Sequence, residues 1–81
     1  MLITPAQVRA GRALLDWTLK DLAQASGVSE KTIQHIEKKY GYTSRPSIQK
    51  LIILSFHENK IDLISGGARF KDGRDPSFED A

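Results

Sequence analysis

Apolar residues recur at helical spacing through most of the chain and change to an alternating pattern near its end. A spacing of three and four residues is typical of amphipathic helices. It predicts helices over about 5–15, 19–25, 30–39 and from Pro46 or Ser47 to about Asn59. Residues 61–64 and 68–71 alternate instead, around the pair Gly66-Gly67, which accepts the positive φ angles of tight turns. The pattern predicts a mainly α fold of four helices followed by a short β-hairpin.

Three polar residues mark the starts of the first three helices. Thr4, Thr18 and Ser29 each stand between an apolar residue and another apolar residue four positions inside the helix, which is the hydrophobic staple. Their hydroxyl groups are suited to accept a hydrogen bond from an unpaired amide of the first turn. Gln7 and Asp21 stand at the third helical position and complete a capping box in the first two cases.

Glycines mark the predicted helix ends. Gly27 and Gly41 stand where the helices from Leu19 and from about Glu30 need a left-handed residue to stop. The cap of the fourth helix is Ser44 or Ser47, and this helix has Ile48, Leu51, Ile52 and Ser55 on one face.

Residues 19–37 combine the features of two helices that cross over a short turn. Ala23 is small where the helices touch, Gly27 is placed at the bend, and Val28, Ile33 and Ile36 are apolar anchors. This stretch resembles the helix-turn-helix of the phage-repressor (Cro and repressor, XRE-like) family of DNA-binding regulators, and the resemblance covers residues 3 to about 56. The opening Thr4–Ala10 and the terminal hairpin are similar to short bacterial regulators of this type. The resemblance implies a compact four-helix, lambda-repressor-like domain.

The helix predicted from about Glu30 has two unlike faces. At about 100° per residue, Ile33, Ile36 and Glu37 share one face, and Lys31, Gln34, His35 and Lys38 lie on the other. A polar face of this kind can be simply solvated, but in the family this helix lies in the major groove of DNA. The resemblance implies base contacts by Glu30, Lys31, Thr32 and His35. Together with the resemblance, the basic and hydroxyl groups at helix starts and in the loop after the third helix predict phosphate contacts. The predicted residues are Thr18, Lys20, Ser29, Gln34, Lys38, Lys39, Thr43, Ser44 and Arg45.

Two further expectations concern packing and assembly. The resemblance implies a structural ion pair between Arg12 and Glu37, which both fall on inward faces. The fourth helix is apolar beyond one core face, so the hairpin or a second subunit must cover the remainder. The predicted homodimer interface consists of Ile53, Leu54, Phe56, Ile61, Leu63 and Ile64. The alternative is a protein-interaction module, such as an antitoxin or an anti-repressor, that uses the same helix and hairpin.

Charge and composition change the picture in two ways. The net charge of +2 divides into a basic segment, 1–71, with 11 basic and 6 acidic residues, and an acidic segment, 72–81. We therefore expect a DNA-binding domain at 1–60, a hairpin at 61–71 and a mobile acidic tail at 72–81. The chain has no cysteine, and its two histidines are 22 residues apart. We expect no enzyme activity, no cofactor and no metal. The longest apolar run, Leu51–Leu54, is too short for a membrane span, and we expect a cytoplasmic protein.

Overall fold

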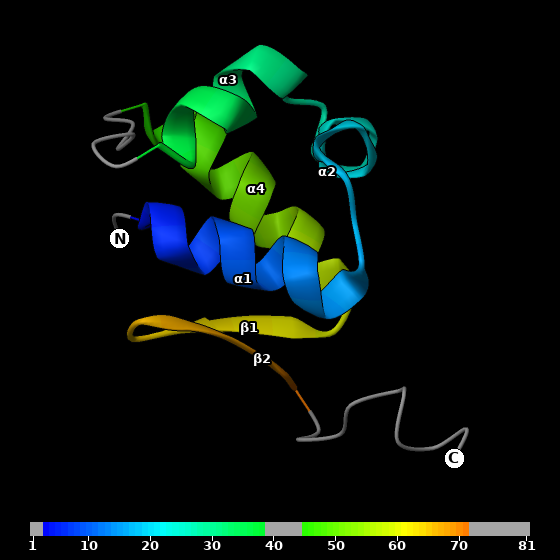
Figure 1. Cartoon of the computed structure of the whole chain (residues 1–81), viewed down its shortest axis with the longest axis vertical. Helices are drawn as coiled ribbons and strands as arrows, with labels where there is room; N and C mark the ends of the chain where they lie inside the picture. Colours follow the sequence, from blue (N-terminus) through cyan, green and yellow to red (C-terminus); the bar gives the residue numbers. More distant parts are fainter. Residues whose placement is uncertain (1–2, 39–44, 72–81) are drawn as a thin grey trace.

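Four helices and one antiparallel hairpin make up the computed structural model, which describes residues 3–38 and 45–71 (Figure 1). The elements are α1 Pro5–Leu15, α2 Leu19–Ser26, α3 Glu30–Ile36, α4 Pro46–Glu58, β1 Ile61–Ile64 and β2 Gly67–Phe70. Figure 1 shows the hairpin along one side of α1, with α2 and α3 at the other end of the molecule. The predicted fold class, four helices followed by a hairpin, is confirmed. The acidic segment 72–81 lies outside the described residues.

The starts of the first three helices form as their sequences predict. The Thr4 hydroxyl accepts a hydrogen bond from the Gln7 amide (3.1 Å), and the Gln7 side chain accepts one from the Thr4 amide (2.9 Å). Thr18 and Asp21 form the same reciprocal pair at the start of α2. Ser29 caps α3 through the Thr32 amide. Two capping boxes and one simple cap therefore set where these helices begin.

The helix ends differ more from the expectations. Gly27 ends α2 in the left-handed region with φ 78°, as predicted. Asp16 does the same for α1 with φ 55°, although it has a side chain. The prediction that the third helix continues to residue 39 is wrong, because α3 ends at Ile36 and is capped by Glu37. Gly41 lies outside the described residues.

The start of α4 also differs from the prediction. Its N-cap is Arg45, whose side chain makes no capping hydrogen bond, and Ser47 lies inside the helix. Pro46 occupies the first position, where the missing amide hydrogen has no cost because that amide would have no partner within the helix. Ser44, the other predicted cap, lies outside the described residues.

The hairpin turns one residue earlier than predicted. Ile61 pairs with Phe70 and Ile64 with Gly67, so the two turn residues are Ser65 and Gly66. Gly66 has the positive φ that the turn requires (80°), whereas Gly67 is the first residue of β2.

The core lies between the helices and the inner face of the hairpin. Its buried members are Ile3, Val8, Leu22, Val28, Ile33, Ile36, Ile52, Phe56, Ile61 and Phe70. Phe56 packs against Gly11, where an added Cβ would come within 2.7 Å of the ring. On another side, its ring stacks on that of Trp17 with the centroids 6.2 Å apart. Glycine at position 11 thus lets the Phe56 ring approach the backbone of α1.

The hairpin packs on the helices of its own chain, which corrects part of the predicted dimer interface. The side chains of Phe56 and Ile61 are 0% and 1% exposed, so they belong to the core and are not accessible to a second subunit. Leu54 and Ile64 remain 48% and 39% exposed. Leu51, expected on the core face of α4, is 42% exposed.

Gln49 is buried at the core side of α4, a position that the sequence pattern did not predict for this polar residue. Its side-chain oxygen accepts a hydrogen bond from the Ile3 amide at 2.9 Å. A second long-range bond runs from the Gln7 side chain to the Ile64 carbonyl (2.8 Å) and joins α1 to β1. The side-chain amides of Gln49 and Gln7 thus connect the beginning of the chain to α4 and to the hairpin.

Candidate nucleic-acid interface

The turn between α2 and α3 is held by a buried serine. The Ser26 hydroxyl donates a hydrogen bond to the Leu22 carbonyl (2.7 Å) and accepts one from the Val28 amide (3.1 Å). Gly27 supplies the left-handed residue between them, and Val28 is buried. The sequence pattern did not predict this role of Ser26, because a serine at the end of a helix does not indicate by itself which groups its hydroxyl will contact. The serine, the glycine and the valine together fix the path of the chain from one helix to the next.

The two faces of α3 separate as the helical spacing predicts. Ile33 and Ile36 are 0% exposed in the core. Lys31, Gln34 and His35 are exposed, as is Lys38 just beyond the helix. Because residues three and four apart are neighbours on a helix, these polar side chains form one continuous surface. We call Lys31, Gln34, His35 and Lys38 the outer face of α3.

The start of α3 adds two of the predicted contact residues. Glu30 is exposed, and Thr32 is half-buried. The Ser29 hydroxyl donates to the Thr32 hydroxyl oxygen (2.9 Å) and accepts from the Thr32 amide (3.2 Å). The hydroxyl hydrogen of Ser29 is therefore used within the protein.

Several predicted phosphate-contacting residues lie on the surface around this helix pair. Thr18 and Lys20 are exposed at the start of α2, and Arg45 is exposed at the start of α4. The Thr18 hydroxyl oxygen accepts from the Asp21 amide, which leaves its hydrogen available as a donor. Lys39, Thr43 and Ser44 lie outside the described residues.

Arg12 and Glu37 form the predicted ion pair between α1 and the end of α3. The Arg12 Nε and Nη2 atoms donate to the two carboxylate oxygens of Glu37 at 2.6 and 2.7 Å. The Arg12 Nη1 atom also donates to the Trp17 carbonyl (2.9 Å). The hydrogen bond to Glu37 and the charge of its carboxylate raise the pKa of Arg12, although burial opposes this shift. The guanidinium thus remains charged and connects three segments.

A second arginine of α1 binds the same residue. The Nη1 atom of Arg9 donates to the backbone carbonyl of Glu37. This contact of Arg9 was not predicted from the sequence. The available signal was its spacing, because residues three apart on a helix lie side by side and Arg12 was already expected to pair with Glu37.

A comparison of the sequence with models of protein families agrees with the arrangement of α2 and α3 as a helix-turn-helix. A model described as helix-turn-helix matches residues 8–55, which includes α2 and α3 entirely and most of α1 and α4. The chain belongs to the XRE-like helix-turn-helix family. This family consists of DNA-binding transcription regulators, so the helix pair α2–α3 belongs to a DNA-binding domain. No curated protein and no solved structure matches the chain.

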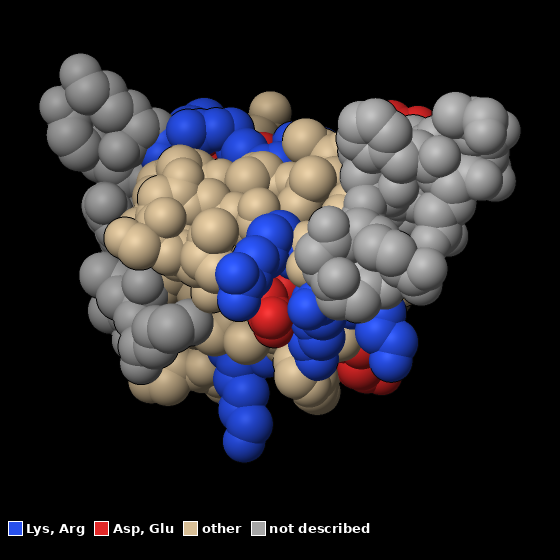
Figure 2. All heavy atoms as spheres, turned by 90° about the horizontal axis from the view of Figure 1, so that it is seen from below, with Lys and Arg blue, Asp and Glu red and all other residues tan. Residues whose placement is uncertain are grey.

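The side of this helix-turn-helix domain that carries the hairpin has mixed charge. Figure 2 views the molecule from that side and shows Lys and Arg side chains with acidic side chains among them. Within the hairpin, Asp62 stands opposite Arg69. Mixed charge of this kind is less suited to a polyanion than the outer face of α3, which carries two lysines, although the exposed acid Glu30 stands at the start of that helix.

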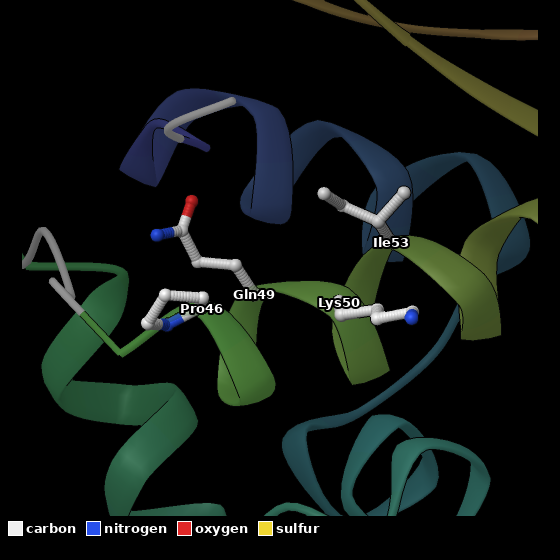
Figure 3. Close-up of a pocket in the computed structure, with 4 residues that line it drawn as sticks. All are labelled: Pro46, Gln49, Lys50 and Ile53. Carbon is white, nitrogen blue, oxygen red and sulfur yellow. The ribbon is translucent and has the colours of Figure 1, made fainter.

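Other surface features do not indicate a different chemistry. A pocket of about 260 Å³ is lined by Pro46, Gln49, Lys50 and Ile53 of α4, and Gln49 points toward the beginning of α1 (Figure 3). Among the described residues, no group of His, Asp and Glu is arranged to hold a metal ion. None of the described helices has the length and apolar character to cross a membrane.

Proposed function

We propose that this protein binds double-stranded DNA sequence-specifically as a homodimeric repressor, with α3 in the major groove. The observation that carries the proposal is the difference between the two faces of α3. Ile33 and Ile36 attach its inner face to the core, whereas its outer face has only exposed polar side chains. A helix that is fixed on one side and polar on the other can place hydrogen-bonding groups against base edges at defined positions.

The side chains at the start of α3 suit different bases. Lys31 is a donor for the O6 and N7 atoms of guanine, and Glu30 is an acceptor for the amino group of cytosine. The methyl group of Thr32 can contact the methyl group of thymine, and His35 lies one turn after Lys31. We assign these four residues to base contacts.

Phosphate contacts fix the register of the protein on the duplex. Thr18 and Lys20 lie at the start of α2, Lys38 and Arg45 lie after α3, and all four are exposed. Charge and hydroxyl groups at such positions supply affinity without reading the sequence. We assign phosphate contacts to Thr18, Lys20, Ser29, Gln34, Lys38 and Arg45, and also to Lys39, Thr43 and Ser44 outside the described residues. The Ser29 hydroxyl can donate to a phosphate oxygen only if its hydrogen bond to the Thr32 hydroxyl opens.

Dimerisation would place two such helices on two half-sites about 34 Å apart. With Phe56 and Ile61 in the core, the proposed contact surface consists of Ile53, Leu54, Leu63 and Ile64. Leu54 and Ile64 supply its most exposed apolar area. Light scattering should give the mass of a dimer at micromolar concentration, and Leu54→Glu should give the mass of a monomer. A monomeric wild-type protein would contradict the dimer and leave DNA binding to be judged separately.

Selection of bound duplexes from a random library tests the proposed function. The expected result is a single enriched motif with two inverted half-sites, because a twofold symmetric dimer reads the same bases in opposite directions. Recovery of an unenriched library would contradict sequence-specific binding. In that case the exposed apolar surface of α4 would favour the protein-interaction alternative.

A further inference from the structure

The C-terminal end of α3 needs stabilisation from outside the helix. The helix has seven residues, and isolated helices of that length are unstable in water. The last carbonyl groups of any helix also have no partner within it. Glu37 caps α3 in a right-handed helical conformation, so no left-handed glycine closes this end.

Arg9 and Arg12 hold Glu37 by two different parts of that residue. Arg12 binds the carboxylate, and Arg9 binds the backbone carbonyl. The two arginines are one helical turn apart on α1, which the core fixes through the buried Val8. The carboxylate bond reaches the main chain of Glu37 only through the side-chain torsions of that residue. The carbonyl bond attaches the main chain itself to α1 and therefore restricts it more directly.

We propose that Arg9 is a positioning residue for DNA recognition, which fixes the end of α3 so that its outer face meets the bases in one orientation. The inference rests on the proposed function, because it concerns the same helix in the same groove. Lys38 follows Glu37 directly and His35 lies two residues before it, so the direction of the Glu37 main chain affects the end of the outer face of α3. A bond that orders the free protein before binding increases affinity, because the ordering is not required again in the complex.

Arg9 contributes more to the orientation of the end of α3 than to the free energy of unfolding of the whole domain. The side chain is exposed, so water can replace it at the carbonyl when it is removed. Its loss should therefore change the order of the helix end and the selectivity for DNA, with little effect on the melting temperature.

The test compares Arg9→Ala with Arg69→Ala, an exposed arginine of β2 on the hairpin side whose removal changes the net charge equally. Affinity is measured for the selected duplex and for a random duplex at several salt concentrations. For Arg9→Ala we expect about a three- to tenfold loss of affinity for the selected duplex, a smaller loss for the random duplex and an unchanged salt slope. Arg69→Ala should change both affinities equally and by less.

Two results with DNA would overturn the proposal. An equal loss on both duplexes with a salt slope smaller by about one would identify Arg9 as a phosphate contact instead. Affinities identical to those of Arg69→Ala would show that the carbonyl bond is not used in recognition.

Amide hydrogen exchange in the free protein tests the bond without DNA. The amides of Glu37 and Lys38 donate to the Ile33 and His35 carbonyls and should exchange several-fold faster in Arg9→Ala, whereas the Leu22 amide should not change. Unchanged exchange at Glu37 and Lys38 would contradict the positioning role. If the wild-type protein bound no duplex, the proposed function would be wrong, and the proposed role of Arg9 in DNA recognition would be wrong as well. The exchange rates would still show whether Arg9 holds the helix end.

Discussion

Arg12 of α1 holds the carboxylate of Glu37 through two hydrogen bonds of 2.6 and 2.7 Å, and this pair attaches the first helix to the end of α3. The side chains are 21% and 9% exposed, so the pair lies at the edge of the core. The third hydrogen bond of Arg12, to the Trp17 carbonyl, attaches α1 to the turn before α2. A single guanidinium thus connects α1 to both ends of the helix pair.

Glu37→Ala should destabilise the fold, because Arg12 would keep its charge without its partner. Buried pairs cost about 3–5 kcal/mol when one partner is removed, and partial exposure reduces this to about 1–3 kcal/mol here. Thermal unfolding should show a melting temperature lower by at least about 4 °C. Glu58→Ala, at an exposed position of α4, is the control and should have little effect. Equal melting temperatures for the two variants would show that the Arg12–Glu37 pair does not stabilise the fold.

The effect of Glu37→Ala should not depend on pH between 7 and 9. The folded pKa of Arg12 is raised above its unfolded value, so the stabilisation is fully present below that unfolded value and is lost only as pH rises through the folded one. Denaturant unfolding at the two pH values should give the same difference in free energy between wild type and variant. A difference that decreases by pH 9 would contradict this assignment.

Gly11→Ala should destabilise the core. The new methyl group would lie 2.7 Å from the Phe56 ring, and the ring is confined by Trp17. Overpacking of this kind costs about 1–3 kcal/mol. Gly67→Ala is a suitable control, because its methyl group would meet Ala10 at an ordinary distance of 4.0 Å. Chemical denaturation of both variants measures the difference, and equal stabilities would show that Phe56 can shift at no cost.

Lys60→Gly should stabilise the protein. Lys60 joins α4 to β1 with φ 66°, a region that costs a residue with a side chain about 1–2 kcal/mol and glycine almost nothing. Because glycine also gains freedom in the unfolded chain, we expect a net gain of about 0.5–1 kcal/mol by chemical denaturation. The control Ser65→Gly, at a turn position without positive φ, should be neutral or destabilising. A loss of stability in Lys60→Gly would show that the lysine side chain compensates for its conformation.

The sequence predicts those features of the fold that depend on near neighbours. Thr4, Thr18 and Ser29 are each followed within three residues by the amide that they cap, so the helix starts can be predicted from local spacing. Gly27 is equally local, because a helix end that requires positive φ selects glycine. The separation of Ile33 and Ile36 from Lys31 and His35 follows from helical geometry alone.

Apart from the Arg12–Glu37 pair, which the family resemblance implied, features that depend on distant contacts were not predicted from the sequence. The early end of α3 coincides with the binding of Glu37 by Arg9 and Arg12, and no local signal separates it from a helix that continues to residue 39. Phe56 resembles an interface residue in the sequence, because its place in the core depends on the gap at Gly11, 45 positions earlier. The register of the hairpin is fixed by the burial of Ile61 and Phe70, so the turn lies one residue earlier than predicted.

Lys31→Glu should abolish DNA binding if α3 enters the major groove. The substitution replaces a donor by an acceptor at a base edge and places a negative charge near the phosphates. Lys60→Glu is the matched control, because it makes the same charge change at the junction of α4 and β1, next to the hairpin. The control should keep most of the affinity.

Fluorescence anisotropy of a labelled duplex, titrated with protein at several salt concentrations, tests the central claim most directly. For the wild-type protein and Lys60→Glu we predict binding whose affinity falls linearly with salt on logarithmic axes, and for Lys31→Glu no binding at the lowest salt concentration. Equal binding by Lys31→Glu and Lys60→Glu, or no salt-dependent binding by the wild-type protein, would contradict recognition of DNA by α3.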